Sequence, residues 1–246
     1  MDRNTEKIKP FGPGCPWYDL QESLGVPNVK WCESTVCSYI NEPANTWSNL
    51  LFFMIGTWII VKNKKSNAWF SHYHGVAILW MGILSFIYHA TNNFGTQIFD
   101  YIGMYLFVFW MLVQNLIRLR FIKEKQRVPV HFLLIASCAI ILPVLYKIHF
   151  HYQLLIFFIS MGIIYTEVRI SFKTDARAKY QYSFTPIYFS LLFFISGVLF
   201  SLIDATRIWC NPENHFIQGH GMWYISCALA SYFAYLFYKQ KGVGYL

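Results

Sequence analysis

Seven stretches of about 20 mostly apolar residues constrain the fold of this chain more than any other feature. They lie at about 44–62, 73–91, 97–117, 129–147, 149–167, 182–203 and 217–238. A segment of this kind is a candidate transmembrane helix, because a helix satisfies its backbone hydrogen bonds internally. The sequence therefore predicts an all-α, polytopic membrane protein with seven transmembrane helices. Only Lys147, His149 and His151 separate the fourth helix from the fifth, and we interpret them as a tight interfacial turn.

Composition and charge support a membrane protein over a soluble or nucleic-acid-binding one. Hydrophobic residues make up 56% of the chain and charged residues 13%, about half the share of a typical soluble domain. The net charge of +8 would suit a nucleic acid, but the basic residues form short clusters between apolar segments. That pattern is typical of a membrane surface. We therefore expect a multi-pass integral membrane protein and no nucleic-acid partner; the pattern does not specify the membrane or the oligomeric state.

The distribution of Lys and Arg predicts the orientation. Fourteen of the 20 basic residues lie in the loops after the first, third and fifth helices and in the C-terminal tail. The positive-inside rule then places the C-terminus in the cytoplasm and the N-terminus outside or in a lumen. The predicted organisation is an extramembrane N-terminal segment (1–43), a seven-helix membrane domain (44–238) and a cytoplasmic tail (239–246).

Four polar side chains within these helices are candidates for function, because such groups are costly in a bilayer. Ser85 and His89 lie one helical turn apart late in the second helix, and Asp100 lies early in the third. The turn-like segment 91–96 makes these two helices an antiparallel hairpin, which returns Asp100 to the level of His89. His220 opens the seventh helix at the same predicted depth. We therefore expect side chains from three helices to converge.

Imidazole and carboxylate groups in such a cluster suggest a zinc-like site, in which an open position holds a water molecule. Asp100 would act as a general base, and Ser85 would orient the water or stabilise an oxyanion. Spacing alone supports equally well a structural hydrogen-bond network that holds the helices together. We interpret the other histidines as non-ligands: His72 and His74 as interfacial, His131 as the start of the fourth helix, and His215 as a loop residue.

Three motifs, in one order, resemble those of the alkaline ceramidases, a family of seven-helix membrane hydrolases. The first comprises Trp-Cys-Glu at 31–33 and Glu-Pro-Ala-Asn-Thr-Trp-Ser-Asn-Leu at 42–50. The second is Ser85 and His89 with Ala-Thr following, then Gln97 and Asp100. The third runs from Ile-Asp at 203–204 through Cys210 to His-Gly-Met-Trp at 220–223. The resemblance extends from about residue 30 to the C-terminus, with matching helix number and orientation.

The resemblance implies an amidase that hydrolyses the amide bond of ceramide by attack of a metal-activated water. By position it implies His89 and His220 as zinc ligands, with Asp100 and Ser85 as the catalytic residues beside the water. The family has a further histidine ligand four residues after the first one in its third motif, and this chain has Tyr224 there. A phenol is a poorer ligand than imidazole at neutral pH, so three cases stay open: zinc held by His89, His220 and Asp100, zinc held with Tyr224 as phenolate, or zinc not held well. A ceramide-like lipid substrate would enter from the bilayer.

Some relatives build a calcium site beside the Trp-Cys-Glu motif, which makes Glu33 and Glu42 candidate calcium ligands here. The expected carboxylate before the tryptophan is Lys30, so we favour surface or helix N-terminal charges for both glutamates over calcium. Cys32 and Cys210 precede helices on the same predicted side, so a disulfide between them is feasible, and the resemblance supports that pair. Cys15 with Cys37 is a second candidate, whereas Cys138 and Cys227 are interpreted as packing residues.

Two other functions remain as alternatives at this stage. Tyr224 favours a catalytically weak relative that binds or senses a lipid and lacks a full zinc site. Intramembrane Asp and His side chains would also suit a small proton-coupled transporter, although the chain shows no internal repeat.

Overall fold

The computed structural model describes residues 11–64, 69–147, 152–173 and 183–240, which form helices and loops. The helices are α1 (Tyr18–Leu24), α2 (Pro43–Trp47), α3 (Leu50–Lys62), α4 (Trp69–Thr91), α5 (Phe94–Arg118), α6 (Arg127–Lys147), α7 (Tyr152–Lys173), α9 (Thr185–Ala205) and α10 (Gly219–Gln240), with one 3-10 turn at Glu124–Gln126. The seven predicted segments correspond, in order, to α2 with α3, then α4, α5, α6, α7, α9 and α10. The largest difference is at the end of α7, which we predicted at 167 and which extends to Lys173. The turn predicted around 149–151 and most of the tail lie outside the described residues.

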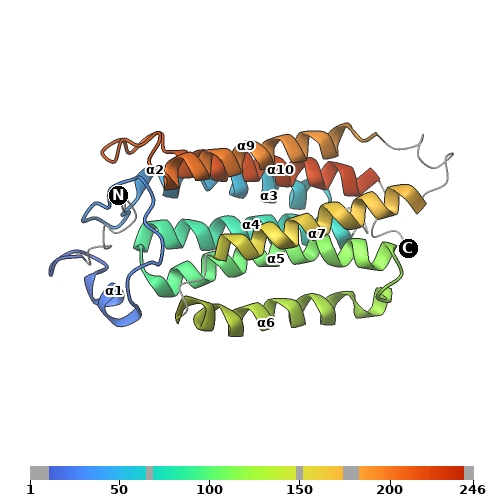
Figure 1. Cartoon of the computed structure of the whole chain (residues 1–246), viewed down its shortest axis with the longest axis horizontal. Coiled ribbons are helices and arrows are strands. Elements are labelled where there is room, and N and C mark those ends of the chain that lie inside the picture. Colours follow the sequence, from blue (N-terminus) through green and yellow to red (C-terminus); the bar gives the residue numbers. More distant parts are fainter. Residues whose placement is uncertain (1–10, 65–68, 148–151, 174–182, 241–246) are drawn as a thin grey trace.

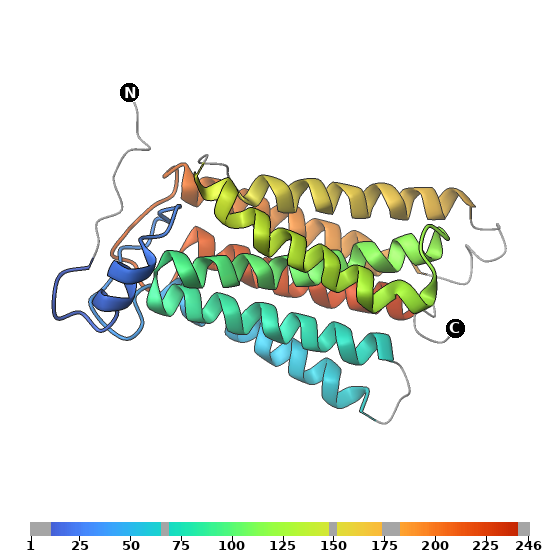
Figure 2. The ribbon, with the colours of Figure 1, turned by 90° about the horizontal axis from the view of Figure 1, so that it is seen from below.

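The long helices run alongside one another in a bundle, with α1 and α2 at one end and the last turn of α10 at the other (Figures 1 and 2). Helix α10 is central, since it contacts α2, α3, α4 and α9. Helix α5 is the second hub and contacts α4, α6 and α7. Helices α4, α5 and α10 carry the candidate functional side chains, so these residues lie in the part of the bundle with the most neighbours.

Within the described residues, six helical segments are long and apolar enough to cross a membrane: Pro43–Lys62, Phe70–Thr91, Phe94–Arg118, Glu124–Leu145, Leu154–Phe172 and Thr185–Ala205. The predicted seventh segment forms helix α10 but does not meet the same apolar criterion. Its polar side chains, among them His220, Ser226 and Ser231, are buried in the bundle. A helix enclosed by other helices does not need an apolar surface on every side, because protein rather than lipid surrounds it.

Close packing of α3 against α4 depends on residues without bulky side chains. A Cβ atom added at Gly56 would lie 2.9 Å from the carbonyl oxygen of Gly75, and one added at Gly82 would lie 2.6 Å from the Cβ of Phe52. Small residues at such contacts let helix backbones approach closely in a membrane. This contact fixes α4, and with it the side chains on the last two turns of that helix.

Candidate active site

The α4–α5 hairpin sets the depth of Ser85, His89 and Asp100. The two helices are joined by Asn92 and Asn93. Asn92 has a φ of 46°, in the left-handed region that asparagine tolerates better than most residues. Asn93 caps α5, because its side-chain oxygen accepts the backbone N–H three residues on, at 3.0 Å. This is the antiparallel hairpin that the sequence predicts, and it brings Asp100 close enough to His89 for a direct electrostatic interaction.

His89 is fully buried and has a partner on each ring nitrogen. Nδ1 lies 2.6 Å from a carboxylate oxygen of Glu42, and Nε2 lies 2.8 Å from the hydroxyl of Tyr224. The Glu42 carboxylate also accepts hydrogen bonds from the side-chain amides of Asn45 at 3.0 Å and Asn92 at 3.3 Å. Because an ionised carboxylate only accepts, Nδ1 carries the ring proton and the Nε2 lone pair accepts the Tyr224 O–H. Glu42 therefore fixes the His89 ring so that Nε2 faces the Tyr224 hydroxyl.

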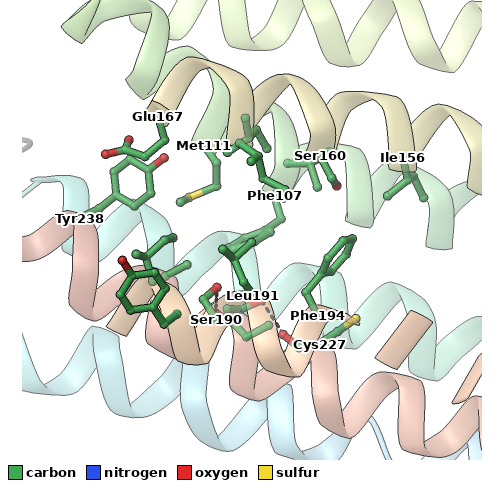
Figure 3. A pocket seen from close by; sticks show the side chains of 18 of the residues that line it. Phe107, Met111, Ile156, Ser160, Glu167, Ser190, Leu191, Phe194, Cys227 and Tyr238 are labelled. Atoms are coloured by element: carbon green, nitrogen blue, oxygen red, sulfur yellow. Dashed lines mark hydrogen bonds between the residues drawn. The ribbon is translucent and has the colours of Figure 1, made fainter. Parts of the chain in front are cut away.

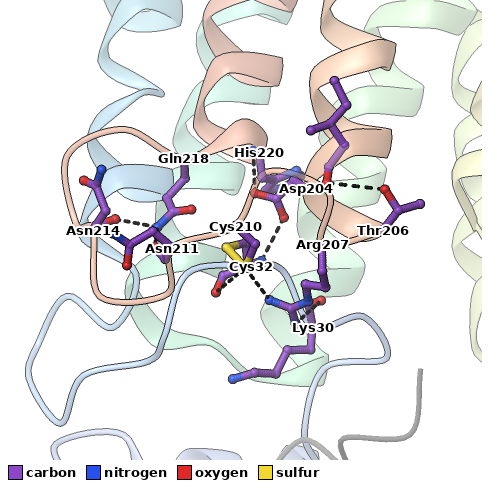
Figure 4. The surroundings of a disulfide bond; sticks show 11 residues. Lys30, Cys32, Asp204, Thr206, Arg207, Cys210, Asn211, Asn214, Gln218 and His220 are labelled. Carbon is purple, nitrogen blue, oxygen red and sulfur yellow. Dashed lines mark hydrogen bonds between the residues drawn. A yellow bond between two sulfur atoms is a disulfide. The ribbon is translucent and has the colours of Figure 1, made fainter. Parts of the chain in front are cut away.

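His220 is held by its backbone and by an aromatic stack. Its N–H donates to the carboxylate of Asp204 at 3.0 Å, and the other oxygen of that carboxylate accepts the N–H of Cys32 at 2.8 Å. The indole ring of Trp31 lies parallel to the imidazole, with centroids 3.4 Å apart and planes 10° apart. Figure 4 shows Asp204 between Cys32 and His220. One buried carboxylate thus ties the first turn of α10 to the N-terminal segment.

The candidate side chains from α4, α5 and α10 converge in one buried cluster. The ring centroids of His89 and His220 are 5.1 Å apart, and Tyr224 lies 5.3 Å from the first and 4.8 Å from the second. Among the described residues, both ring nitrogens of His220 lack a hydrogen-bond partner, and Oγ of Ser85 and Oδ1 of Asp100 lack a well-aligned one, although Ser85, Asp100 and Tyr224 lie close enough to interact. Buried polar atoms are nearly always satisfied in folded proteins. Four such atoms in one place indicate a site that takes up a polar ligand or water.

The N-terminal segment closes this end of the bundle through Glu33. Its two carboxylate oxygens accept the backbone N–H groups of Ala44 at 2.9 Å and Asn45 at 3.0 Å, and one of them lies 3.0 Å from Nδ1 of His215. Burial raises the pKa of Glu33 above its ordinary value, and the hydrogen bond from His215 opposes that rise. Of the two interpretations favoured over calcium, a surface location is wrong for Glu33 and Glu42, since both are buried. Glu33 matches the other interpretation, a negative charge at the N-terminus of a helix, here α2.

Two disulfides fasten the N-terminal segment to itself and to the loop before α10. One joins Cys32 to Cys210, and the other joins Cys15 to Cys37. The first helps to place Trp31 over His220, because the neighbouring Cys32 is held by its disulfide and by the hydrogen bond from its backbone N–H to Asp204. Cys138 and Cys227 are free thiols, consistent with their interpretation as packing residues.

The donor atoms present fit a metal ion only in part. In the described part of the chain, no three His, Cys, Asp or Glu side chains are grouped as a metal site. The cluster does offer the Nε2 electron pair of His89 and the unpaired nitrogens of His220. The third donor near these nitrogens is the phenolic oxygen of Tyr224, which is hydrogen-bonded to Nε2 of His89. A zinc site here would therefore need Tyr224 in the place of a third imidazole, the substitution that the sequence reveals.

An apolar cavity of about 520 Å³ extends from this cluster into the bundle. It lies between α5, α7, α9 and α10, and Tyr224 lines its end beside the polar cluster. Figure 3 shows Glu167 and Tyr238 together at one end of the cavity and Ile156 toward the other. The size is within the range of small-molecule sites, about 300 to 1,000 Å³. The lining is apolar apart from a few hydroxyls and Glu167, as a lipid chain requires.

A family model described as Ceramidase matches residues 26–243. The chain belongs to the ceramidase family. The match covers nearly the whole chain, including all three motifs and all the long helices. Among curated proteins, none matches the chain. Membership makes this protein a ceramidase-like hydrolase, of a family whose reaction is the cleavage of an amide bond in a membrane lipid.

Within this ceramidase-family site, the structure also contains interactions that sequence reasoning missed. The sequence alone did not predict that Glu42 pairs with His89 or that Trp31 stacks on His220. Nor did it predict that the Asp204 carboxylate accepts the backbone N–H groups of both Cys32 and His220. Each of these residues lies in a motif that we had matched to the family, so the motifs marked them without revealing their partners. One further expectation was wrong. His74 is not interfacial but fully buried, with Nε2 3.3 Å from the carbonyl oxygen of Ser231.

Proposed function

We propose that the protein hydrolyses the amide bond of ceramide or a closely related lipid amide at the cluster of Ser85, His89, Asp100 and His220. One observation carries the proposal: Tyr224 joins the cluster of unsatisfied buried polar atoms to one end of an apolar cavity, since its hydroxyl is hydrogen-bonded to His89 and its side chain lines the cavity. A lipid amide matches this arrangement, because it has one polar group to place among these atoms and a hydrocarbon chain to place in the cavity. Family membership supplies the reaction class.

In this proposal Asp100 moves the proton. Its carboxylate would take a proton from the attacking water and deliver it to the nitrogen of the leaving amine, since an amine is a poor leaving group until it is protonated. Oδ1 has no well-aligned hydrogen-bond partner in the described structure, so it can bind that water, with Ser85 and Tyr224 beside the carboxylate. Ser85, one turn before His89 on α4, would orient the water or donate to the carbonyl oxygen as negative charge develops there.

Zinc is the metal we propose for this site. His89 and His220 would hold it, with the Tyr224 oxygen as a third donor and Glu42 fixing the His89 ring. When bound, zinc would lower the pKa of a water molecule and stabilise negative charge on the amide oxygen. Calcium is a weaker proposal, because both candidate ligands already have protein partners: Glu33 binds the N-terminus of α2, and Glu42 binds His89.

The substrate would enter sideways from the bilayer, between α7 and α9. Val168 and Phe172 of α7 and Tyr188 of α9 line the cavity, yet they are 46%, 81% and 67% exposed. Residues that are both lining and exposed mark a mouth, and this mouth faces the surface that lipid would cover. A ceramide could therefore reach the cluster without crossing water.

We also propose that the end of the bundle carrying the site faces the outside or a lumen, with residues 1–43 covering it. Both disulfides of the described chain lie at that end. Disulfides persist in oxidising compartments and are rare in the cytosol. The basic loops predicted to be cytoplasmic belong to the opposite end, which gives the same orientation.

Purified protein incubated with ceramide, with fatty acid and base measured by mass spectrometry, tests the proposed reaction. We expect Asp100→Asn and Ser85→Ala to reduce turnover, the former by about 10²- to 10⁴-fold as for loss of a general base. Asp19→Asn, at an exposed position on α1, and Ser137→Ala, at a half-buried position on α6, are matched controls and should leave turnover unchanged. Full turnover in Asp100→Asn would refute the assignment of the site.

A catalytically weak lipid-binding relative is the second candidate, and one observation favours it. The Tyr224 hydroxyl already occupies Nε2 of His89, the atom that would bind zinc. Metal analysis separates the two functions. The hydrolase requires about one zinc per chain, lost in His89→Ala and in His220→Ala, whereas a protein that binds ceramide and contains no zinc would support the second candidate.

A further inference from the structure

The loop between α9 and α10 holds four large apolar side chains away from the protein. They form two pairs, Ile208 with Trp209 just after α9, and Phe216 with Ile217 just before α10. The four residues are between 51% and 92% exposed, and they are referred to below as the apolar loop pairs. So many large exposed apolar groups in one short loop mark a contact surface.

Hydrogen bonds of the loop backbone fix the direction of these side chains. The N–H of Ile208 donates to the carbonyl oxygen of Ile203 at 3.1 Å. The side-chain oxygen of Asn214 accepts the N–H groups of Phe216 at 3.0 Å and Ile217 at 3.1 Å. A turn held in this way by an asparagine side chain has a defined shape. The apolar loop pairs are therefore exposed because the loop is built to present them.

The length of α9 places both pairs at a membrane surface. Its 21 residues extend about 31 Å at 1.5 Å per residue, close to the thickness of about 30 Å of a hydrocarbon core. The first pair comes three and four residues after the end of this helix, Ala205. A Cβ atom added at Gly219 would lie 2.9 Å from the Cβ of Asp204, so α10 begins beside the last turn of α9. The second pair precedes that point and lies at a similar depth.

An apolar row on the outer face of α9 leads directly to the loop. Its members are exposed and recur every third or fourth residue: Tyr188, Leu192, Ile195, Leu199 and Leu202. Lipid covers such a face on a spanning helix, and the first apolar pair continues it beyond the helix. Tryptophan is enriched at the boundary between membrane and water, because its ring is amphipathic. The turn between the pairs, 211–214, is polar and contains the exposed Glu213, so only the pairs suit the lipid.

The same loop is fastened to the segment that covers the candidate site. Cys210 forms the disulfide with Cys32, which Figure 4 shows. The carbonyl oxygen of Pro212 accepts the N–H of Ser34 at 2.9 Å. Trp31, next to these attachments, stacks on an imidazole ring of the site. Residues 30–34, named the cover below, are therefore held by the loop.

We propose that the apolar loop pairs insert into the headgroup region of the bilayer and so anchor the cover of the site to the membrane. The partner is lipid, because the pairs continue the outer row of α9 and lie where a membrane surface meets the bundle. The polar turn between them limits the insertion to the headgroup level. The inference requires that the bundle spans a bilayer and does not depend on ceramide hydrolysis.

Trp209 reports the insertion directly. Full-length protein is placed in phosphatidylcholine vesicles whose lipids carry bromine either near the headgroup or at the chain end. The difference in fluorescence between the parent and Trp209→Phe gives the signal of this indole. We expect bromine near the headgroup to quench it at least about twofold more strongly than bromine at the chain end. Trp110→Phe is the matched control, because the Trp110 indole is fully buried and neither lipid should quench it.

Three outcomes of the quenching experiment would overturn the proposal. Stronger quenching by bromine at the chain end would place the loop in the hydrocarbon region. Quenching by aqueous iodide alone would place it in water. Protection of Trp209 from lipid and iodide alike would show that a protein partner or a second copy of this chain covers the loop.

Hydrogen exchange tests whether lipid contact holds the cover. Phe216→Ser combined with Ile217→Ser removes one pair, and we expect the N–H groups of Cys32 and Ser34 to exchange about tenfold faster in vesicles. Phe121→Ser is the matched control, because Phe121 is exposed in the loop at the opposite end of the bundle and should leave this exchange unchanged. Unchanged exchange in the folded double variant, checked by its thermal midpoint, would overturn the anchoring. Both measurements give a result whether or not ceramide is hydrolysed, so this inference and the proposed function can fail separately.

Discussion

Replacing Glu42 by Gln tests how much the buried carboxylate that is hydrogen-bonded to His89 contributes to stability and to metal binding. Glu42 accepts three hydrogen bonds, from His89 at 2.6 Å, Asn45 at 3.0 Å and Asn92 at 3.3 Å. A bond to a charged acceptor contributes about 1.5 to 3 kcal/mol and a neutral one about 0.5 to 1.5 kcal/mol. Neutralising the acceptor of three bonds therefore costs about 3 kcal/mol. Gln also has to point its own N–H₂ group at one of these donors.

For a chain of this length, about 3 kcal/mol corresponds to a fall of about 6 to 12 °C in the thermal midpoint. Unfolding of the purified protein in detergent, followed by tryptophan fluorescence, measures that fall. Glu22→Gln is the matched control, because Glu22 is exposed on α1. Loss of a carboxylate partner also lowers the metal affinity of a histidine ligand by about 10- to 100-fold. If Glu42→Gln unfolds at the same temperature as the control and keeps its zinc, the role of the pair has been misjudged.

Three further predictions concern the same end of the bundle. Tyr224→His supplies the missing imidazole and should retain zinc better than the parent in dialysis against a chelator; equal or faster loss would contradict the ligand assignment. Asp204→Ala leaves the buried backbone N–H groups of Cys32 and His220 without their acceptor, so we expect about 2 to 6 kcal/mol less stability, measured by chemical unfolding. Cys32→Ser opens the disulfide to Cys210 and should cost about 2 to 5 kcal/mol, whereas a thermal midpoint unchanged by reductant in the parent would show that this bond does not matter.

The helix pattern was predictable because it depends on local chemistry. A span in a bilayer must satisfy its backbone and be apolar outside, so its length and composition can be recognised residue by residue. Helix α10 is the instructive exception. We predicted it as one of seven spans, but its buried serines and histidine reduce its apolar character, because it is surrounded by other helices. Only its position in the bundle explains why these residues are tolerated.

The candidate site was partly predictable for a related reason. Helical spacing places Ser85 and His89 on one face of α4, and a short turn returns Asp100 to their level. These relations extend over fewer than 20 residues of chain. The prediction that His74 is interfacial was wrong, because sequence position alone does not say whether a histidine near a helix end faces the membrane surface or the bundle interior. The packing of α4 against α10 decided in favour of the interior.

What the sequence by itself determined was the class of protein, its helices, the depth of its polar residues and the family motifs that include them. What only the tertiary structure decided was which atoms meet. Glu42 and His89 are 47 residues apart, and His89 and Tyr224 are 135 apart. No local periodicity specifies such pairs, because they depend on how the N-terminal segment and α10 fold back onto α4. The apolar cavity likewise exists only where helices from separate parts of the chain surround a space, so it could be found only in the folded protein.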